Sequence, residues 1–349
     1  MKDFRSDNVA GASQAIIESI IHSNKDSASS YGDDKYTARL ISNLENLFEK
    51  KVSVYPVSTG TAANAICFAS SVPSYGAIFC SKDAHAVVDE CNAPEFYTGG
   101  AKVIGLNDFK GKITADSLAE AADGIAPHGV HNPQPSLVSL TQATEVGTVY
   151  TPKEIESISK VAHDRKMYVH IDGARIANAV VSLNCSWSEI TWKAGVDLLS
   201  FGATKNGALA AEAAICFRDN LFDDIKFYRK RGGHLFSKMR FLSAQLNAYI
   251  EEELWKKNAQ NANYMAKKLA DGLKALPEVE LVYPVEANGV FIRLPEYIVN
   301  ALYDEGYNFD KWGKKDSNMY RLMTSFNSEI KSVQNLIQSA QLATKKNGI

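Results

Sequence analysis

The feature that most constrains the fold is an alternation of short apolar runs with a helical pattern, between residues 137 and 205. The runs at 137–140, 167–171 and 196–201 have the length of buried strands. The stretch 151–162 opens with Thr, Pro and Glu at the positions of an N-cap, N1 and N3, and continues with one apolar face. Strands that alternate with helices form parallel sheets. The sequence therefore predicts an α/β fold with a mainly parallel sheet flanked by helices.

The pattern changes near residue 241, where a long helical stretch is expected to continue to 275. Apolar runs at 279–283 and 289–294 follow, and an amphipathic helix is expected at 329–346. We therefore predict an N-terminal arm (1–14), a large domain (15–245) and a smaller C-terminal α+β domain (246–349).

Composition excludes several classes of protein. The 349 residues include 38 Lys and Arg against 40 Asp and Glu, and 45% are hydrophobic, so a disordered, collagen-like or basic nucleic-acid-binding chain is not expected. The first eight residues are polar, and no apolar run reaches the roughly 20 residues that span a bilayer. The five cysteines never form a C-x-x-C pair, which is typical of reduced thiols. We predict a cytoplasmic protein without a membrane or nucleic-acid partner.

Two of the predicted strands end in residues suited to chemistry. Asp172 begins the sequence DGAR after the run 167–171, and Lys205 lies in a Gly-rich turn after the run 196–201. Ligands in open α/β sheets bind at the carboxyl ends of the strands. A lysine there can form a Schiff base, and an aspartate can keep a pyridinium nitrogen protonated. A solvated loop lysine and a helix-capping aspartate are the alternatives.

A phosphate site is indicated at residues 58–64 (STGTAAN), because small and hydroxyl residues at a helix start offer free N–H groups to an anion. A simple N-cap is the alternative. The segment has neither the dinucleotide fingerprint nor the P-loop motif, and Ala208 stands where a P-loop at 202–207 needs its lysine. A nucleotide-dependent enzyme is therefore not predicted.

Three further residues are candidates for the site. His85 and His131 can exchange protons, and the spacing of His131 from His128 fits no metal site, so no metal is predicted. Arg321 lies in a strand-like apolar run, where an arginine needs a carboxylate. Ordinary hydrogen-bonded histidines and an internal salt bridge are the alternatives.

Seven short motifs, in chain order, carry a resemblance to a known family. They are RSD (5–7), YGDD (31–34), TGTAAN (59–64), AH (84–85), HIDGAR (170–175), TK (204–205) and MR (239–240). Together they resemble the L-threonine aldolases of the threonine aldolase and β-eliminating lyase family, which are fold-type-I pyridoxal 5′-phosphate (PLP) enzymes. The segments TQATE (141–145) and SFGATKNG (200–207) resemble the low-specificity branch.

The resemblance implies a role for each matching residue. Lys205 would form the internal aldimine with PLP, Asp172 would pair with the ring nitrogen, and His85 would stack on the ring. The other implied cofactor contacts are Arg175, Gly60, Thr61, Thr204, Gln142, Lys230 and Arg240, and the implied substrate contacts are Ser6, Tyr31, Arg175 and Arg321. His85, His131 or a water molecule would act as the base at the substrate's β-hydroxyl.

Two departures from the family pattern concern the site. Many members have the sequence Glu-Asn-Thr-His-Asn after the strand that ends in Ser-Leu. In this chain the sequence TQATE (141–145) follows Leu140 instead. Asn8 stands where a threonine is common.

The implied reaction is a retro-aldol cleavage of L-threonine, L-allo-threonine or another β-hydroxy-α-amino acid to glycine and an aldehyde. The implied assembly is a homo-oligomer, a dimer or a dimer of dimers (a homotetramer), with sites shared between chains near Tyr31, Lys230 and Arg240. A PLP-dependent β-eliminating lyase acting on another amino acid is the alternative enzyme. A non-catalytic protein with this fold is the alternative from another class.

Overall fold

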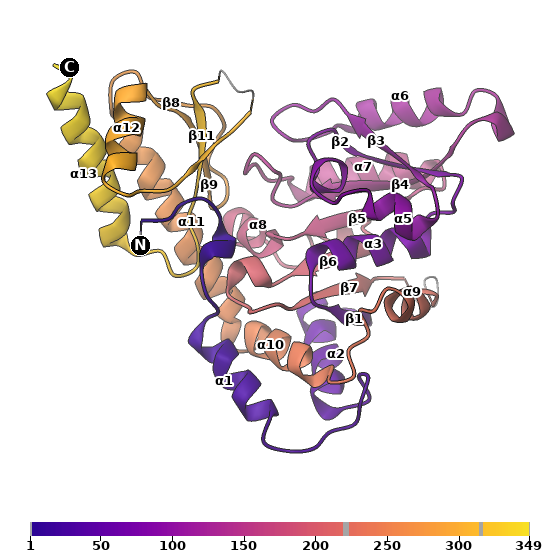
Figure 1. The fold of residues 1–349 in the computed structure, drawn as a ribbon. Coiled ribbons are helices and arrows are strands. Elements are labelled where there is room, and N and C mark those ends of the chain that lie inside the picture. Colours follow the sequence, from indigo (N-terminus) through magenta and orange to yellow (C-terminus); the bar gives the residue numbers. More distant parts are fainter. Residues whose placement is uncertain (1, 219–222, 314–316, 349) are drawn as a thin grey trace.

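The computed structural model describes residues 2–218, 223–313 and 317–348, which form two sheets with helices around each (Figure 1). The larger sheet has seven strands. They are β1 (Ser53–Val57), β2 (Gly76–Ser81), β3 (Lys102–Leu106), β4 (Gln134–Thr141), β5 (Tyr168–Gly173), β6 (Leu198–Gly202) and β7 (Glu212–Cys216), in the spatial order β1-β7-β6-β5-β4-β2-β3.

The larger sheet is mainly parallel, as predicted. Strands β2 to β6 pair in parallel, and only β7 runs antiparallel to its neighbours β6 and β1. The register places Thr141 opposite Asp172, and Asp172 opposite Ser200. The carboxyl ends of β4, β5 and β6 therefore meet at one edge, where a ligand site is expected.

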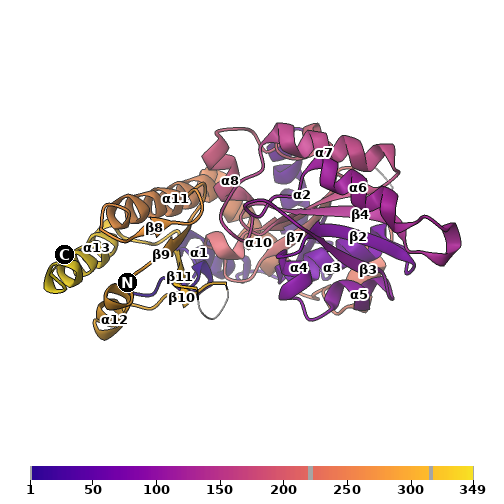
Figure 2. The same ribbon diagram turned by 90° about the horizontal axis from the view of Figure 1, so that it is seen from above.

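Helices cover both faces of this sheet (Figure 2). One face carries α2 (Lys35–Phe48), α6 (Ala115–Ile125), α7 (Pro152–Asp164), α8 (Ile176–Leu183) and α10 (Arg240–Ile250), whose buried side chains share one hydrophobic cluster. The other face carries α3 (Gly60–Ser71), α5 (Ala93–Thr98) and α9 (Ile225–Arg231). The short α4 (His85–Val88) follows β2, and α1 (Gln14–Ser23) packs on α10.

Short 3₁₀ turns join several of these elements. They are η1 (Asp7–Val9), η2 (Gly129–His131), η3 (Trp192–Ala194), η4 (Thr204–Asn206) and η5 (Glu251–Glu253). The predicted start of α7 is confirmed: Thr151 and Glu154 form a reciprocal capping box, and Pro152 occupies the first helical position.

The smaller sheet is antiparallel, in the order β10-β11-β9-β8. Its strands are β8 (Glu280–Leu281), β9 (Gly289–Arg293), β10 (Asp310–Lys311) and β11 (Met319–Met323), and α11 (Leu254–Leu273), α12 (Glu296–Asp304) and α13 (Ile330–Lys346) pack with it around a second core. The predicted amphipathic C-terminal helix is confirmed as α13. The smaller unit has the α+β character expected from the sequence.

One predicted element is wrong: the single helical stretch 241–275 is two helices. Glu252 and Glu253 both have φ of 53°, in the left-handed region, which a right-handed helix cannot continue. The chain therefore turns at η5 between α10 and α11.

The domain limits 1–14, 15–245 and 246–349 stay a prediction. Residue 245 lies inside α10, and the two ends of α11 belong to different hydrophobic clusters.

The N-terminal segment crosses to the smaller unit, as Figure 1 shows. The N–H of Phe4 donates to the carbonyl of Asn308, and the carbonyl of Phe4 accepts from the N–H of Met323, both at 2.7 Å. The Phe4 ring is buried in the second core. Residues 2–4 are thereby tied to the sheet of the smaller unit, which fixes the position of η1 just after them.

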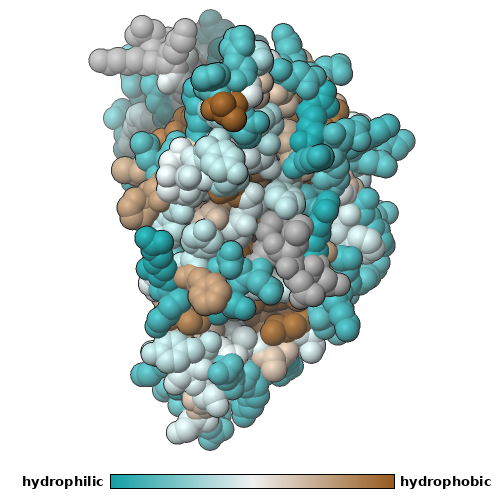
Figure 3. Space-filling model, turned by 90° about the vertical axis from the view of Figure 1, so that its right-hand side faces the viewer, coloured by the Kyte–Doolittle hydropathy of each residue, from teal (hydrophilic) through white to brown (hydrophobic). Residues whose placement is uncertain are grey.

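The face of the molecule to the right in Figure 1 is largely polar. Figure 3, which shows the side to the right in Figure 1, has small separate hydrophobic patches on a mostly hydrophilic face. In the described part of the chain, no helix is both long and apolar enough to cross a membrane. The five cysteines, all within the described ranges, are free thiols.

Candidate active site

A cavity of about 300 Å³ lies where β4, β5 and β6 end. Its walls come from the loops after β1, β4, β5 and β6, from the start of α4 and from η1. Seven of the residues singled out in the sequence line it, namely Gly60, Thr61, His85, Asp172, Arg175, Thr204 and Lys205. The structure therefore brings together residues from four of the seven motifs.

Asp172 is held as a buried anion at the end of β5. Its Oδ2 accepts from Asn64 Nδ2 at 2.8 Å and its Oδ1 accepts from the N–H of Ala174 at 3.0 Å. Burial opposes ionisation of Asp172, but the hydrogen bond from Asn64 and the charge of Lys205 hold its pKa below the usual value. The site therefore has a fixed negative charge facing the cavity.

Lys205 lies in η4, which a buried glutamate supports. Glu212, at the start of β7, accepts from the N–H groups of Ala203 and Thr204, both at 3.3 Å. The Thr204 hydroxyl in turn accepts from the N–H of Ala211 at 3.2 Å. Burial raises the pKa of Glu212 to about 7, although the hydrogen bond from the Thr204 hydroxyl and the positive charge of Lys205 both lower it. These bonds fix the turn that presents Lys205 to the cavity.

The start of α3 forms another wall. The Thr59 hydroxyl caps the helix by accepting from the N–H of Ala62 at 3.1 Å. A Cβ built on Gly60 meets no described atom within 4 Å, so the space above the first turn is open. Free N–H groups and the positive end of the helix dipole suit an anion here.

His85 is oriented by a buried glutamate. Its Nδ1 lies 2.9 Å from Glu90 Oε1, and the same oxygen accepts from Asn64 Nδ2 at 2.9 Å. The hydrogen bond to Glu90 raises the pKa of His85, although burial opposes this. Asn64 thus links Glu90 to Asp172 through the two hydrogens of one amide.

Arg175 is fixed by the N-terminal segment. Its Nε and Nη2 donate to the two oxygens of Asp7 at 2.7 and 2.9 Å, and Asn288 also donates to Asp7, at 3.1 Å. Burial opposes the charge on Asp7, but Arg175 holds the Asp7 pKa below its usual value. This buried pair joins η1 to both units at the edge of the cavity.

Arg321, on β11, lies beside the main cavity rather than in it. It lines a much smaller cavity that shares Glu145 and Arg175 with the main one. The internal salt bridge considered for Arg321 is present, since its Nη2 donates to Asp310 at 3.0 Å. Its Nε is buried and has no hydrogen-bond partner in the described residues. Burial and the nearby Arg175 lower the pKa of Arg321.

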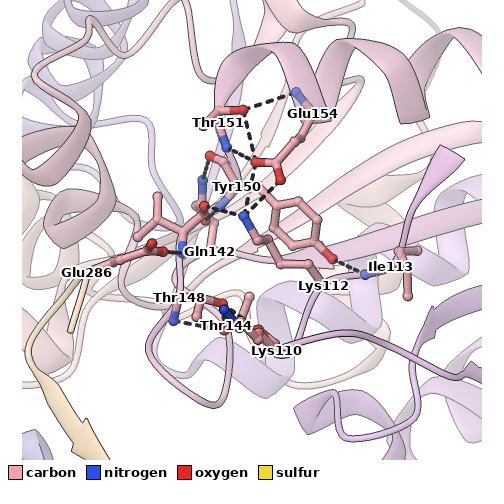
Figure 4. A network of polar contacts seen from close by, with 11 residues as sticks. Lys110, Lys112, Ile113, Gln142, Thr144, Thr148, Tyr150, Thr151, Glu154 and Glu286 are labelled. Carbon is pink, nitrogen blue, oxygen red and sulfur yellow. Dashed lines mark hydrogen bonds and ion pairs between the residues drawn. The ribbon is translucent and has the colours of Figure 1, made fainter. Parts of the chain in front are cut away.

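Gln142, His131 and Ser6 also do not line the main cavity. Gln142 is fully buried, and its amide bonds twice to the backbone of Tyr150, as Figure 4 shows. His131 is exposed on η2, which precedes β4, and so lies at the end of that strand opposite to the cavity. The Ser6 hydroxyl caps η1, and Asn8 lines the cavity instead.

Tyr31, Lys230 and Arg240 are also outside the cavity. Tyr31 is half exposed, and the Lys230 ammonium lies 4.9 Å from its ring centre. Arg240, at the start of α10, donates to the carbonyl of Ser23 at 3.2 Å.

Sequence reasoning missed several carboxylates and amides of the site. They are Asp7, Asn64, Glu90, Glu145, Glu212 and Asn288. Asp7, Asn64 and Glu145 lie inside the motifs RSD, TGTAAN and TQATE, so those motifs carry a sequence signal for them. Glu90, Glu212 and Asn288 carry no sequence signal, because only folding brings them to the site.

Comparison with known proteins extends these findings. The model of the beta-eliminating lyase family matches residues 3–296. A low-specificity L-threonine aldolase of Pseudomonas aeruginosa is 39% identical over 342 residues, which is 98% of this chain and 97% of that protein. A solved threonine aldolase of Leishmania major has a TM-score of 0.90 at 26% identity, covering 98% of this chain and 100% of that chain.

A solved structure of SPT with PLP has a TM-score of 0.72 at 15% identity and covers 99% of this chain and 88% of that chain, so this likeness concerns the fold alone. The predicted fold class is confirmed as that of the fold-type-I PLP enzymes. The chain belongs to the beta-eliminating lyase family, in the part of it that contains the low-specificity L-threonine aldolases.

Proposed function

We propose that this chain is a PLP-dependent aldolase that cleaves L-threonine, L-allo-threonine and similar β-hydroxy-α-amino acids to glycine and an aldehyde. The observation that carries the proposal is one cavity that joins the Lys205 amine, the buried Asp172 carboxylate and the open start of α3. The full-length likeness to low-specificity L-threonine aldolases supports the choice of substrate.

The described residues fit PLP by their chemistry. Lys205 supplies an amine for the aldehyde, Asp172 an anion for the ring nitrogen, and Gly60 and Thr61 an open helix start for the phosphate. When bound, PLP stabilises the negative charge that develops at the α-carbon of an amino acid.

The chain's own residues then orient the substrate. Arg175 and Arg321 border the same small cavity, so a substrate carboxylate placed there meets two guanidinium groups. His85, with its Nδ1 fixed by Glu90, covers the cavity from α4. Asp172 would hold a proton on the ring nitrogen of bound PLP, because its own carboxylate stays charged. Holding the carboxylate fixes which bond of the α-carbon is set to break.

The direct test is release of acetaldehyde from L-threonine and L-allo-threonine, offered separately to the PLP-loaded protein. We expect release from both, and no turnover from Lys205→Ala, whereas the surface variant Lys226→Ala should match the wild type. Bound PLP with no aldehyde from either substrate would overturn the proposal. A β-eliminating lyase acting on another amino acid, or a protein with this fold and no catalysis, would then take its place.

We also propose a homo-oligomer, a dimer or dimer of dimers, in which Tyr31, Lys230 and Arg240 of one chain face the site of another. Its support is the Tyr31–Lys230 contact on the surface, away from the chain's own cavity.

We further propose a cytoplasmic location. Its support is the five free cysteines, because thiols stay reduced in the cytoplasm.

A further inference from the structure

One carboxylate in the cavity has no assigned task. Glu145 lies in the loop after β4 and borders both the main cavity and the small cavity of Arg321. Its Oε1 accepts from the N–H of His85 at 3.0 Å. Its Oε2 is buried and has no hydrogen-bond partner within the described ranges. A buried carboxylate oxygen without a donor is costly, and such groups recur where a ligand supplies the missing contact.

The loop that carries Glu145 is held on both sides (Figure 4). The hydroxyls of Thr144 and Thr148 lie 2.7 Å apart, and the N–H of Thr144 donates to the carbonyl of Thr148 at 2.9 Å. The Gln142 side-chain amide adds two hydrogen bonds across the same loop, one to the carbonyl and one from the N–H of Tyr150. The carboxylate is therefore set in place before any ligand binds, as catalytic groups need to be.

The surroundings of Glu145 suit proton exchange near neutral pH. Burial, helped by the negative charge of Asp172, raises the pKa of Glu145 to about 7. Hydrogen bonds from the His85 N–H and the Thr141 hydroxyl act in the opposite direction and lower the pKa. The other charged groups that border the same cavities are Lys205, Glu90 and Glu212, and the two guanidinium groups of Arg175 and Arg321. A base works best when its pKa lies close to the working pH.

We propose that Glu145 is the base that takes the proton from the substrate's β-hydroxyl. This inference rests on the proposed aldolase function. Glu145 borders the cavity of the two arginines, so a substrate whose carboxylate they hold lies within the walls that Glu145 forms. The other protein candidates are less suited. The hydrogen bond to Glu90 favours the protonated form of His85, which cannot accept a proton, and His131 lies beyond the opposite end of β4.

The proposed step balances. The β-hydroxyl proton moves to Glu145, the O–H electron pair forms the C=O bond of the aldehyde, and the Cα–Cβ pair stays with the glycine fragment. Cα later takes up one proton, and Glu145 loses one, so the net reaction is the amino acid giving glycine and an aldehyde. Proton transfer by one positioned group is typically worth about 10²–10⁴-fold in rate.

The test uses Glu145→Gln in the PLP-loaded protein, with Glu286→Gln as the matched control. Glu286 is also partly buried and accepts a backbone N–H, that of Val149 at 2.8 Å, but lies outside the main cavity. Three quantities are measured in each protein: the affinity for PLP, exchange of the α-hydrogen of glycine with deuterated water, and aldehyde release from L-threonine.

We expect Glu145→Gln to lower kcat for aldehyde release by about 10²-fold or more, with PLP affinity and glycine exchange within roughly threefold of wild type. In the wild type, kcat/KM should rise with pH through about 7 as Glu145 loses its proton, and the variant should lose that rise. Glu286→Gln should resemble wild type in every measurement.

Unchanged aldehyde release in Glu145→Gln would overturn the assignment, as would an equal loss of PLP affinity and glycine exchange, which marks a structural role. If Glu145→Gln does not fold, Glu145→Asp takes its place, and a wild-type kcat with an unchanged pH profile in that shorter variant also overturns the assignment. Absence of aldehyde from the wild type instead overturns the proposed function, so the two failures are distinct.

Discussion

At the scale of single residues, carboxylates within one cavity differ in acidity because their partners differ. Asp172 receives two hydrogen bonds and lies near Lys205, so its pKa is lowered despite burial. Burial raises the pKa of Glu145, whose Oε2 has no hydrogen-bond partner in the described residues, and of Glu212, which has long bonds of 3.3 Å, to about 7 in each case. Burial sets the cost of the charge, and the strength of the hydrogen bonds together with the nearby charges decides whether the charge is kept.

The same reasoning predicts the effect of Glu90 on His85. Glu90→Gln removes the carboxylate that stabilises the imidazolium, so the pKa of His85 should fall to or below the ordinary value of 6.5. Titration of the His85 ring by NMR measures this. The neighbouring exposed Asp89→Asn is the control and should leave the His85 titration unchanged. An unchanged His85 pKa in Glu90→Gln would contradict the role given to this pair.

At the scale of elements, two exposed threonines cap helices in the same way but face different surroundings. Thr59 begins α3 at the cavity, and Thr151 begins α7 on the outside of the sheet. Both hydroxyls accept an N–H of the first turn. Cap and helix dipole together suit the start of α3 to an anion in the cavity, whereas the cap of α7 only stabilises its helix.

Replacing either threonine by alanine should therefore lower the free energy of unfolding by about 1 kcal/mol, as measured in urea on the protein without PLP. Only Thr59→Ala should also weaken PLP binding, by roughly severalfold, because its helix start faces the cavity. Equal PLP affinities in Thr59→Ala and Thr151→Ala would argue against a phosphate site at α3.

At the scale of the whole molecule, the N-terminal segment joins the two units at the site. Phe4 is buried in the smaller core, and Asp7, three residues later, pairs with Arg175 beside the main cavity. Asn288, from the loop before β9, also donates to Asp7. The position of Arg175 beside the cavity therefore depends on both units being folded together.

The proposed assembly makes a prediction at this scale. Light scattering should give a mass of at least two chains, and Lys230→Ala should weaken PLP binding although Lys230 lies outside its own chain's cavity. If sites are shared, mixing Lys205→Ala with Lys230→Ala should form hybrid sites with both lysines intact and restore activity. A monomeric mass, or mixtures no more active than their parts, would contradict shared sites.

Local patterns in the sequence predicted the centre of the larger unit. Apolar runs gave the three central strands, and the Thr-Pro-x-Glu pattern gave the start of α7, because strand and cap signals depend on neighbouring residues. The break between α10 and α11 could not be predicted, because glutamate has a high helix propensity and nothing local marks Glu252 and Glu253 as a turn. Their left-handed backbone follows from the packing of the two helices.

For the candidate site, sequence patterns predicted that Asp172 and Lys205 lie close together, since each follows a strand and parallel strands end at one edge. Which polar groups surround these two residues depends on the folded chain. Asp7, Glu90 and Glu145 come from an arm, a helix end and a loop that are far apart along the chain. The physical reason is that acidity and orientation depend on burial and on distances between groups, and these exist only once the chain has folded.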